Sequence, residues 1–411
     1  MPSTELRARR REFLDEYARL KDLSLSLDMT RGKPSAEQLD LSDALLSLPG
    51  ESEAGGVDTR NYGGADGLAG ARQLFAEILE VPPENVLVGG NASLTLMYET
   101  LARACLFGAP GGSGPWSGIE NKKFICPAPG YDRHFTITEH LGFELLLVPM
   151  RDDGPDMDEV ESLAGGDDSV KGIWCVPKYH NPTGACYGAD TLARLASMRA
   201  APDFRILWDN AYAEHHLFED RPALDNIAQL CKEAGNADRV VQFASTSKIC
   251  HPGSGVAAMA ASDANIADAR AHLAVQTIGP DKVNQLRLLK FFGGIENLRA
   301  HMKKHAALLR PKFEAVWEVL ERELGGLGIA EWSKPRGGYF ISLDIPDNCA
   351  ARAVQLAAEA GVTLTAAGAT FPHGKDPRDR NIRIAPTFPP LDDVRRACEV
   401  LAVCVKLAAS E

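Results

Sequence analysis

Lys248 stands directly after an apolar run, in a position where a lysine needs an explanation. Residues 240–248 read VVQFASTSK, so a stretch typical of a buried strand continues into three hydroxyl side chains and then an amine. A lysine that follows a strand is usually a solvated loop residue. A partly desolvated lysine near another cation, however, has a lowered pKa and can form a Schiff base. Lys248 is therefore a candidate catalytic amine, provided that other reactive groups lie beside it.

Four other apolar runs also end in unusual polar residues. The run VLVGG leads into Asn91, Ala92 and Ser93, FICPAPG into Tyr131, GIWCVPKYH into Asn181, and RILW into Asp209 with Tyr212 three residues later. In open α/β sheets, ligands bind in the crevice beyond the carboxyl ends of the strands. Each feature alone is explained equally well by a turn or a helix cap. Their joint arrangement is not, so we expect these side chains to converge at one edge of a sheet.

Together these side chains match the needs of one cofactor. The N-terminus of a helix with serines binds a phosphate, and a buried carboxylate such as that of Asp209 needs a cationic partner such as a protonated ring nitrogen. Tyr131 can stack on an aromatic ring, while Asn181 and Tyr212 can donate hydrogen bonds to a phenolate oxygen. With Lys248 as the amine, this set predicts pyridoxal 5'-phosphate.

The elements that must position these residues alternate along the chain. Short apolar runs between about residues 60 and 290 are separated by helical or polar stretches, which predicts an α/β fold with a mixed, mostly parallel sheet covered on both faces. Helices are expected over residues 4–23 and 295–324, and a small α+β domain follows the second of them. The predicted divisions are an N-terminal helix and arm (1–45), a large cofactor-binding domain (46–298) and a small domain (299–411).

Composition excludes several classes of function. The 411 residues carry a net charge of -12, so attraction to nucleic acid or to anionic lipid is not expected. No apolar run reaches the roughly 20 residues of a membrane span, and the N-terminus is too polar for a signal peptide. Nine cysteines without a CxxC pair indicate reduced thiols in a cytoplasmic protein. The spacing of cysteine and histidine predicts no metal site.

The motifs, in their order, resemble those of the fold-type I pyridoxal-phosphate aminotransferases, and within them a bacterial aspartate aminotransferase subgroup (Ic) that is related to the catalytic part of MocR-type proteins. The similarity runs from LDMTRGKP (27–34) through RNYGGADG, GGNASLTLMYE, PGYDRH, HNPTG, DNAY and STSK to NIRIAP. The resemblance implies transamination between L-aspartate or L-glutamate and a 2-oxo acid, either 2-oxoglutarate or oxaloacetate. Lys248 would be the Schiff-base lysine, Asp209 the partner of the ring nitrogen, and Tyr212 the third catalytic residue.

The same resemblance implies roles for the remaining site residues. Arg383 would bind the substrate α-carboxylate, with Asn181 and the backbone N–H of Gly32 beside it. Tyr62 would reach the phosphate of a neighbouring subunit, which implies a homodimer with shared active sites. The phosphate-binding positions would be Asn91, Ala92, Ser93, Ser245 and Ser247.

Two departures from the family pattern lie near the phosphate and the substrate. The arginine that usually follows the lysine is missing from HPGSG, so we expect Lys282 or Arg287, or the hydroxyls of Ser247 and Ser254, to replace it. No motif marks the residue that recognises a side-chain carboxylate, for which Arg31 is one candidate.

Other functions remain open to different degrees. A serine acyl enzyme with a Ser-x-x-Lys motif would need that motif to open a helix and a later Lys-Thr-Gly, and the chain has no Lys-Thr-Gly. A transcriptional regulator of the related type would need a DNA-binding domain before RGKP, where only about 30 residues stand. A lyase, a decarboxylase or an aminotransferase for a different amino acid would use almost every residue named above.

Overall fold

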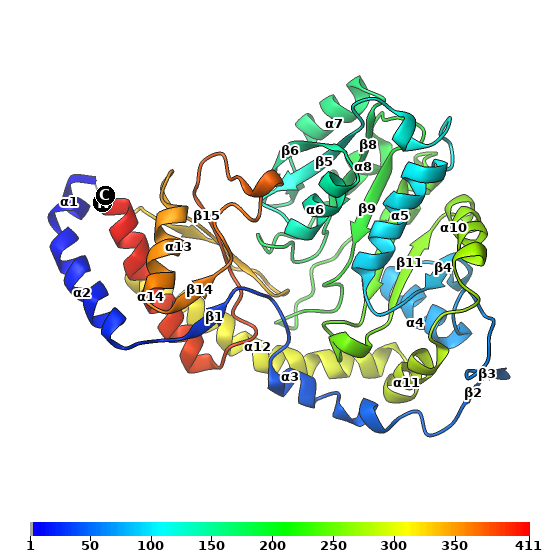
Figure 1. Cartoon of the computed structure of the whole chain (residues 1–411), viewed down its shortest axis with the longest axis horizontal. Coiled ribbons are helices and arrows are strands. Elements are labelled where there is room, and N and C mark those ends of the chain that lie inside the picture. The colour runs from blue at the N-terminus through cyan, green and yellow to red at the C-terminus, as the bar shows by residue number, and fades with distance from the viewer. Residues whose placement is uncertain (1–2) are drawn as a thin grey trace.

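An eight-stranded sheet forms the centre of the larger part of the molecule, in a computed structural model that describes residues 3–411 (Figure 1). Its order is β4 (Val86–Val88), β11 (Ala257–Ala261), β10 (Val240–Ser245), β9 (Arg205–Asp209), β8 (Val170–Cys175), β5 (Lys123–Ala128), β6 (Glu144–Arg151) and β7 (Gly154–Pro155). The four pairings from β10 to β6 are parallel, whereas the pairings of β11 and β7 are antiparallel. The predicted mixed, mostly parallel sheet is confirmed.

Helices cover both faces of this sheet. They are α4 (Ala69–Leu79), α5 (Ser93–Phe107), α6 (Asp132–His140), α7 (Met157–Gly166), α8 (Ala189–Ser197), α9 (Ile227–Glu233), α10 (Asp263–Gln276) and α11 (Lys282–Phe292). Strand β9 shows why its sequence is apolar throughout: Leu207 packs in the core under α5, while Ile206 and Trp208 pack in the opposite core under α7 and α8. A strand that is covered on both faces needs apolar residues at consecutive positions.

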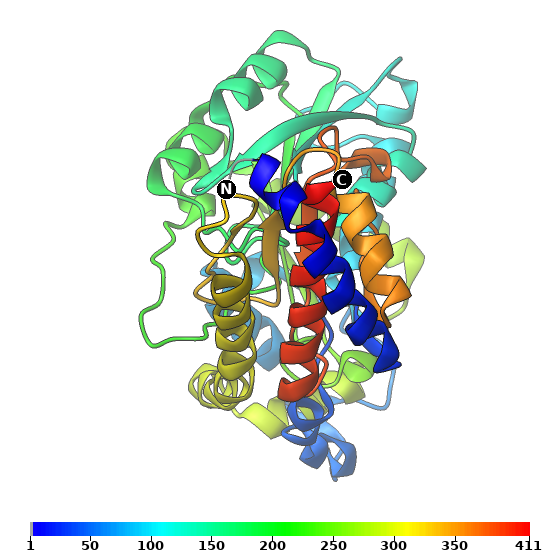
Figure 2. The same ribbon diagram turned by 90° about the vertical axis from the view of Figure 1, so that its left-hand side faces the viewer.

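The smaller part of the molecule contains two short sheets and the chain ends. One sheet pairs β12 (Glu331–Trp332), β13 (Ile341–Asp344) and β15 (Asn381–Ile384), and the other pairs β1 (Leu27–Met29) with β14 (Val362–Leu364). Helices α2 (Arg10–Asp22), α14 (Leu391–Ser410) and α13 (Ala350–Glu359) stand side by side over them (Figure 2). The N-terminal part of the chain also contains α1 (Ser3–Ala8), α3 (Ala36–Asp40), β2 (Glu53–Ala54) and β3 (Val57–Asp58).

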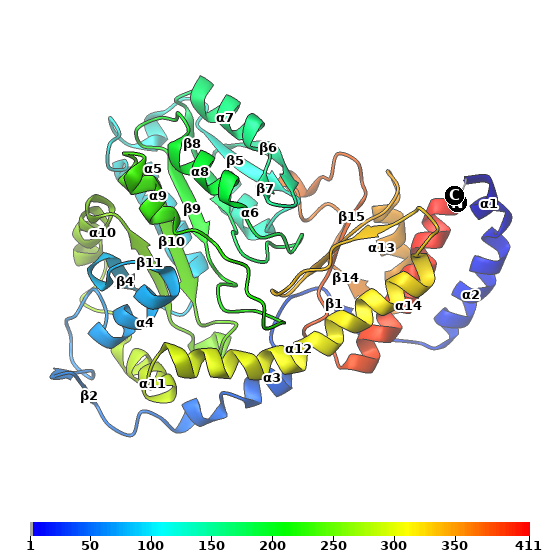
Figure 3. The same ribbon diagram turned by 180° about the vertical axis from the view of Figure 1, so that it is seen from behind.

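Helix α12 (Ile295–Leu324) connects the two parts without a break, as the view from behind shows (Figure 3). Its bounds confirm the helix that was predicted over 295–324. The predicted domain boundary at 298 falls inside this helix, and the division into domains stays a prediction. The single helix predicted over 4–23 is wrong in one respect, because two helices, α1 and α2, meet at Arg9.

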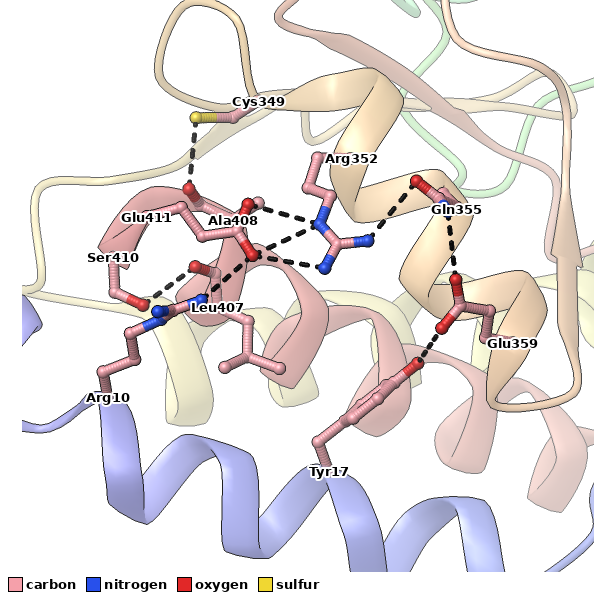
Figure 4. Close-up of polar contacts among 10 residues, drawn as sticks. All are labelled: Arg10, Tyr17, Cys349, Arg352, Gln355, Glu359, Leu407, Ala408, Ser410 and Glu411. Carbon is pink, nitrogen blue, oxygen red and sulfur yellow. Dashed lines mark hydrogen bonds and ion pairs between the residues drawn. The ribbon is translucent and has the colours of Figure 1, made fainter.

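The two chain ends are fastened together at the surface. The carboxylate of Glu411 lies 3.2 Å from the guanidinium groups of both Arg10 and Arg352 (Figure 4). Below them, the buried hydroxyl of Tyr17 donates to the carbonyl of Leu356 at 2.8 Å. All nine cysteines are free thiols. Among the described residues, no helix combines the length and the apolar character that crossing a membrane would require.

Candidate active site

Six of the predicted site residues line one cavity of ≈ 500 Å³ at the carboxyl edge of the large sheet. They come from both parts of the molecule, namely Gly32, Tyr131, Asn181, Tyr212, Lys248 and Arg383. The convergence follows from topology: β5, β8, β9 and β10 are parallel, so the segments that follow them emerge at the same edge. The strand-end polar residues are therefore neighbours in space, although up to 117 positions separate Tyr131 from Lys248 in the sequence.

Lys248 is a largely desolvated amine. Its Nζ lies 5.2 Å from the centre of the Tyr212 ring, and its side chain emerges from an irregular turn after β10. Burial lowers the pKa of Lys248, and the carboxylate of Asp209 opposes this effect only in part. A lowered pKa increases the neutral, nucleophilic fraction of the amine.

Asp209 ends β9 with one carboxylate oxygen engaged and the other free. Its Oδ2 accepts from His134 Nε2 at 3.0 Å, and both side chains are almost completely buried. The His134 ring stacks on Trp174 with centroids 4.1 Å apart. The second oxygen, Oδ1, is buried and has no hydrogen-bond partner within residues 3–411. A buried carboxylate oxygen without a donor is costly, so this atom fits a ligand that brings an N–H group.

Two tyrosines flank this carboxylate and stay protonated. Burial and the charge of Asp209 raise the pKa of Tyr131 to about 12. Burial also raises the pKa of Tyr212 well above its ordinary value. Both phenols therefore act as hydrogen-bond donors across the neutral range.

Arg383 lies on the side of the cavity that belongs to the smaller part of the molecule. Its Nη1 donates to Asp132 at 3.1 Å and to Asn181 Oδ1 at 3.3 Å, whereas its buried Nε has no partner among the described residues. The guanidinium lies over the Phe340 ring, 4.9 Å from its centre. A Cβ atom at Gly32 would come within 2.4 Å of the same ring. Only a glycine therefore lets the backbone at position 32 pack against this ring.

The predicted phosphate-binding residues lie beside the Lys248 turn. Ser93 is the first residue of α5, whose first N–H groups have no partner inside the helix. Ala92 occupies the cap position before it. Ser247 Oγ donates to the carbonyl of Asn91 at 2.8 Å, which ties the start of α5 to the turn that carries Lys248. Ser245 is the last residue of β10.

The structure places the predicted replacements for the missing arginine in other contacts. Lys282 Nζ donates to the carbonyl of Gly63 at 2.6 Å, and Arg287 Nε donates to the carbonyl of Leu48 at 3.1 Å. The backbone carbonyl of Ser254 accepts from Asn284. Tyr62 is 80% exposed and does not line the cavity of its own chain. The roles of these residues at a phosphate stay predictions.

Two further arginines line the cavity. Arg31 precedes Gly32 and Arg133 follows Asp132, and both side chains are exposed at its mouth. Neither guanidinium has a hydrogen-bond or ion-pair partner in the described part of the chain. With Asp132 already paired to Arg383, the cavity carries an excess of positive charge.

Comparison with known proteins agrees with this site. The family model described as aspartate amino-transferase matches residues 1–411. The chain belongs to the aspartate aminotransferase family. An aspartate aminotransferase of Corynebacterium glutamicum is 48% identical over 400 residues, which cover 96% of this chain and 92% of that protein. The crystal structure of an aspartate transaminase from the same organism superposes with a TM-score of 0.97 at 46% identity, over 100% of this chain and 97% of that chain.

More distant aminotransferases share the fold alone. An α-aminoadipate aminotransferase from Thermus thermophilus, solved in complex with N-(5'-phosphopyridoxyl)-L-leucine, has a TM-score of 0.74 at 21% identity and covers 96% of this chain and 94% of its own. This aspartate aminotransferase family member therefore has fold type I, as predicted.

Several site residues of the aminotransferase were missed from sequence. His134 had a signal, because it lies three residues after Tyr131 at the start of a helix, where positions i and i+3 share a face. Asp132, the ion-pair partner of Arg383, carried no signal of its own. Gln38 and Tyr339 carried none either, because their contacts join segments 301 residues apart.

Proposed function

We propose that the protein transfers an amino group between L-aspartate or L-glutamate and a 2-oxo acid, with pyridoxal 5'-phosphate bound in the cavity. Two features of the site carry this proposal. Lys248 is a desolvated amine, and the buried Oδ1 of Asp209 has no hydrogen-bond partner among the described residues. A pyridinium N–H would satisfy that oxygen. The phosphopyridoxyl compound bound in the Thermus thermophilus structure supports the same cofactor on this fold.

The residues around the cavity fit the group from several sides. The first turn of α5, with Ser93, and the hydroxyls of Ser245 and Ser247 would hold the phosphate. Tyr131 would lie against the ring, and the protonated phenol of Tyr212 would donate to the ring oxygen together with Asn181. When bound, pyridoxal phosphate supplies a reactive aldehyde carbon and an electron-accepting ring.

The chain itself supplies proton transfer and orientation. Lys248 Nζ would hold the aldehyde of the bound cofactor, and as a free amine it would carry the proton that leaves the substrate α-carbon. Asp209 would keep the ring nitrogen of the cofactor protonated, and His134 orients the Asp209 carboxylate through their 3.0 Å hydrogen bond. Arg383, with its free Nε, binds the α-carboxylate next to the Gly32 N–H and so fixes which bond at the α-carbon faces Lys248.

The charge of the cavity supports a substrate with two carboxylates. Arg383 accounts for one carboxylate, and Arg31 and Arg133 supply cationic groups for a second one. We therefore assign the side-chain carboxylate of L-aspartate or L-glutamate to these two arginines.

A homodimer in the cytoplasm is the proposed form of the enzyme. Tyr62 is 80% exposed, and Val275 and Ile278 nearby are 91% and 67% exposed. The hydrogen bond from Gly63 N to Ile278 O shows that these segments are neighbours. Large apolar side chains gathered at one surface support contact with a second copy. Nine free thiols support a reducing compartment.

An absorbance spectrum of the purified protein tests the proposal. We expect a yellow protein whose visible band bleaches when L-aspartate is added without any oxo acid, with oxaloacetate released into solution. A yellow protein that ignores aspartate would point to another amino acid or to a lyase. A colourless protein that pyridoxal phosphate cannot reconstitute would overturn the assignment of Lys248 and the cofactor together.

A further inference from the structure

The backbone around Lys248 is held by side chains. Residues 246–250 form an irregular turn, and the carbonyls of Lys248 and Ile249 accept no backbone hydrogen bond in the described chain. Lys248 O instead receives contacts at 3.3 Å from Tyr339 Oη and from His215 Nε2. Ile249 O accepts from His301 Nε2 at 2.9 Å. Because buried carbonyls need donors, these side chains determine how the turn is oriented.

Gln38 determines the direction of the hydrogen bond from Tyr339. The amide of Gln38 is completely buried, and its Oε1 accepts from Ser35 N at 3.1 Å. Its Nε2 lies 3.0 Å from Tyr339 Oη and 2.9 Å from His305 Nδ1. With its two N–H groups directed at these atoms, Gln38 donates to the tyrosine oxygen. The tyrosine proton is then free to point at Lys248 O.

The histidines of this network are neutral. Burial lowers the pKa of both His215 and His305 to about 3, and it lowers the pKa of His301 as well. His305 Nδ1 lies 2.9 Å from Gln38 Nε2, and His305 Nε2 lies 3.0 Å from His301 Nε2, so the three side chains pack as one buried cluster. In the chain that runs from Ser35 through Gln38 and Tyr339 to Lys248 O, each group has one consistent role as donor or acceptor.

The network also contacts the segments that bind the substrate carboxylate. Gln38 follows Gly32 in the N-terminal arm, and Tyr339 precedes Phe340, whose ring lies under Arg383 and against Gly32. The rings of Tyr339 and Tyr212 lie 5.9 Å apart. The same two segments thus reach both the α-carboxylate side of the cavity and the backbone of the lysine.

We propose that Gln38 and Tyr339 are positioning residues for Lys248: the hydrogen-bond chain Gln38–Tyr339–Lys248 O fixes the turn that aims Nζ into the cavity. The inference rests on the proposed function of Lys248. It adds a role for two residues that do not line the cavity.

Tyr339→Phe tests the proposal, because it removes one hydroxyl and keeps the ring contacts. In the full-length protein loaded with pyridoxal phosphate, we expect the pH midpoint of the visible absorbance change, which reports protonation of Lys248 Nζ in its bond to the cofactor, to move by about half a unit or more. We expect kcat to fall about tenfold while KM changes less than about threefold, since one hydrogen bond that positions the lysine is lost.

Tyr17→Phe is the matched control. The buried Tyr17 hydroxyl also donates to a backbone carbonyl, that of Leu356 at 2.8 Å, but it lies in the layer formed by α2, α13 and α14. Both variants should lower the thermal midpoint of unfolding, and only Tyr339→Phe should move the absorbance midpoint. Should Tyr339→Phe not fold, Gln38→Met removes the donor that orients the tyrosine and must move the same midpoint.

An unchanged absorbance midpoint and kcat in a folded Tyr339→Phe or Gln38→Met protein would overturn the positioning role while leaving the proposed function intact. A wild-type protein that does not bind pyridoxal phosphate would instead contradict the proposed function itself. The two failures are therefore distinguishable.

Discussion

Arg31 and Arg133 are two arginines of the cavity lining whose guanidinium groups form no hydrogen bond or ion pair with the described chain. If they bind the side-chain carboxylate, Arg31→Gln or Arg133→Gln should lower kcat/KM for L-aspartate about tenfold, the effect of one charge-assisted hydrogen bond at a partly exposed site. The same variant should leave kcat/KM for L-2-aminobutyrate, which lacks that carboxylate, within about twofold. Steady-state kinetics with both donors measures the difference.

The control for this pair is Arg151→Gln. Arg151 is exposed and forms an ion pair with Asp156 outside the cavity lining, so the variant removes one positive charge without touching the site. Its ratio of activities on the two donors should equal that of the wild type. An equal loss on both donors in the Arg31 and Arg133 variants would assign these arginines to general attraction of anions instead of recognition.

At the scale of elements, the sequence predicts the strands and helices that depend on a short stretch of neighbouring residues. The strand RILW was predictable because burial on two faces leaves a run of consecutive apolar residues. The helix over 295–324 was predictable because burial of one helical stripe leaves a periodic pattern. The convergence of Asp209 and Lys248 was predictable because parallel strands share an edge. Contacts such as Gln38 with Tyr339 were not, since a buried glutamine leaves no pattern and its partner depends on how two distant segments pack.

The loop over 108–118 contains a buried residue whose contact could not be predicted from the local sequence. Its glycines and prolines are typical of turns, yet Trp116 within it is completely buried, and its Nε1 donates to Asp203 at 2.8 Å. Asp203 also pairs with Lys171 of β8 at 2.7 Å, and both of these charged side chains are more than nine-tenths buried. A loop whose sequence resembles a linker therefore donates a hydrogen bond to a buried ion pair beside β8 and β9.

Asp203→Ala should destabilise the protein by about 3–5 kcal/mol, because it leaves the charge of Lys171 and the indole N–H of Trp116 buried without an acceptor. Urea denaturation at neutral pH measures the free energy of unfolding. The control is Asp158→Ala on α7, where the carboxylate is 89% exposed and pairs with Arg194; a change within about 0.5 kcal/mol is expected there. Similar losses of unfolding free energy in both variants would show that the buried pair stabilises the protein no more than an exposed one does.

The whole molecule depends on α12, which crosses from the large sheet to the layer formed by α2, α13 and α14. Its buried His301 and His305 contact the turn after Lys248, and its later residues pack against α14. The site and the chain ends are thus built on one continuous helix.

Buried histidines make the stability of the whole molecule depend on pH in one direction. Burial lowers the pKa of His180, His215 and His305 to about 3, against 6.5 in the unfolded chain. Between these values the unfolded chain binds more protons than the folded one. The contribution of these histidines to the free energy of unfolding is therefore complete above about pH 6.5 and is lost as the pH decreases toward 3. Each histidine contributes up to about 1.4 kcal/mol per pH unit in this window, which amounts to about 4 kcal/mol for the three at pH 5.5.

Urea denaturation at pH 7.5 and 5.5 measures this loss, and His373→Gln, at an exposed site, should leave it unchanged. Equal stability at the two pH values would mean that these rings can be protonated in the folded protein, and the neutral network behind Lys248 would then have to be abandoned.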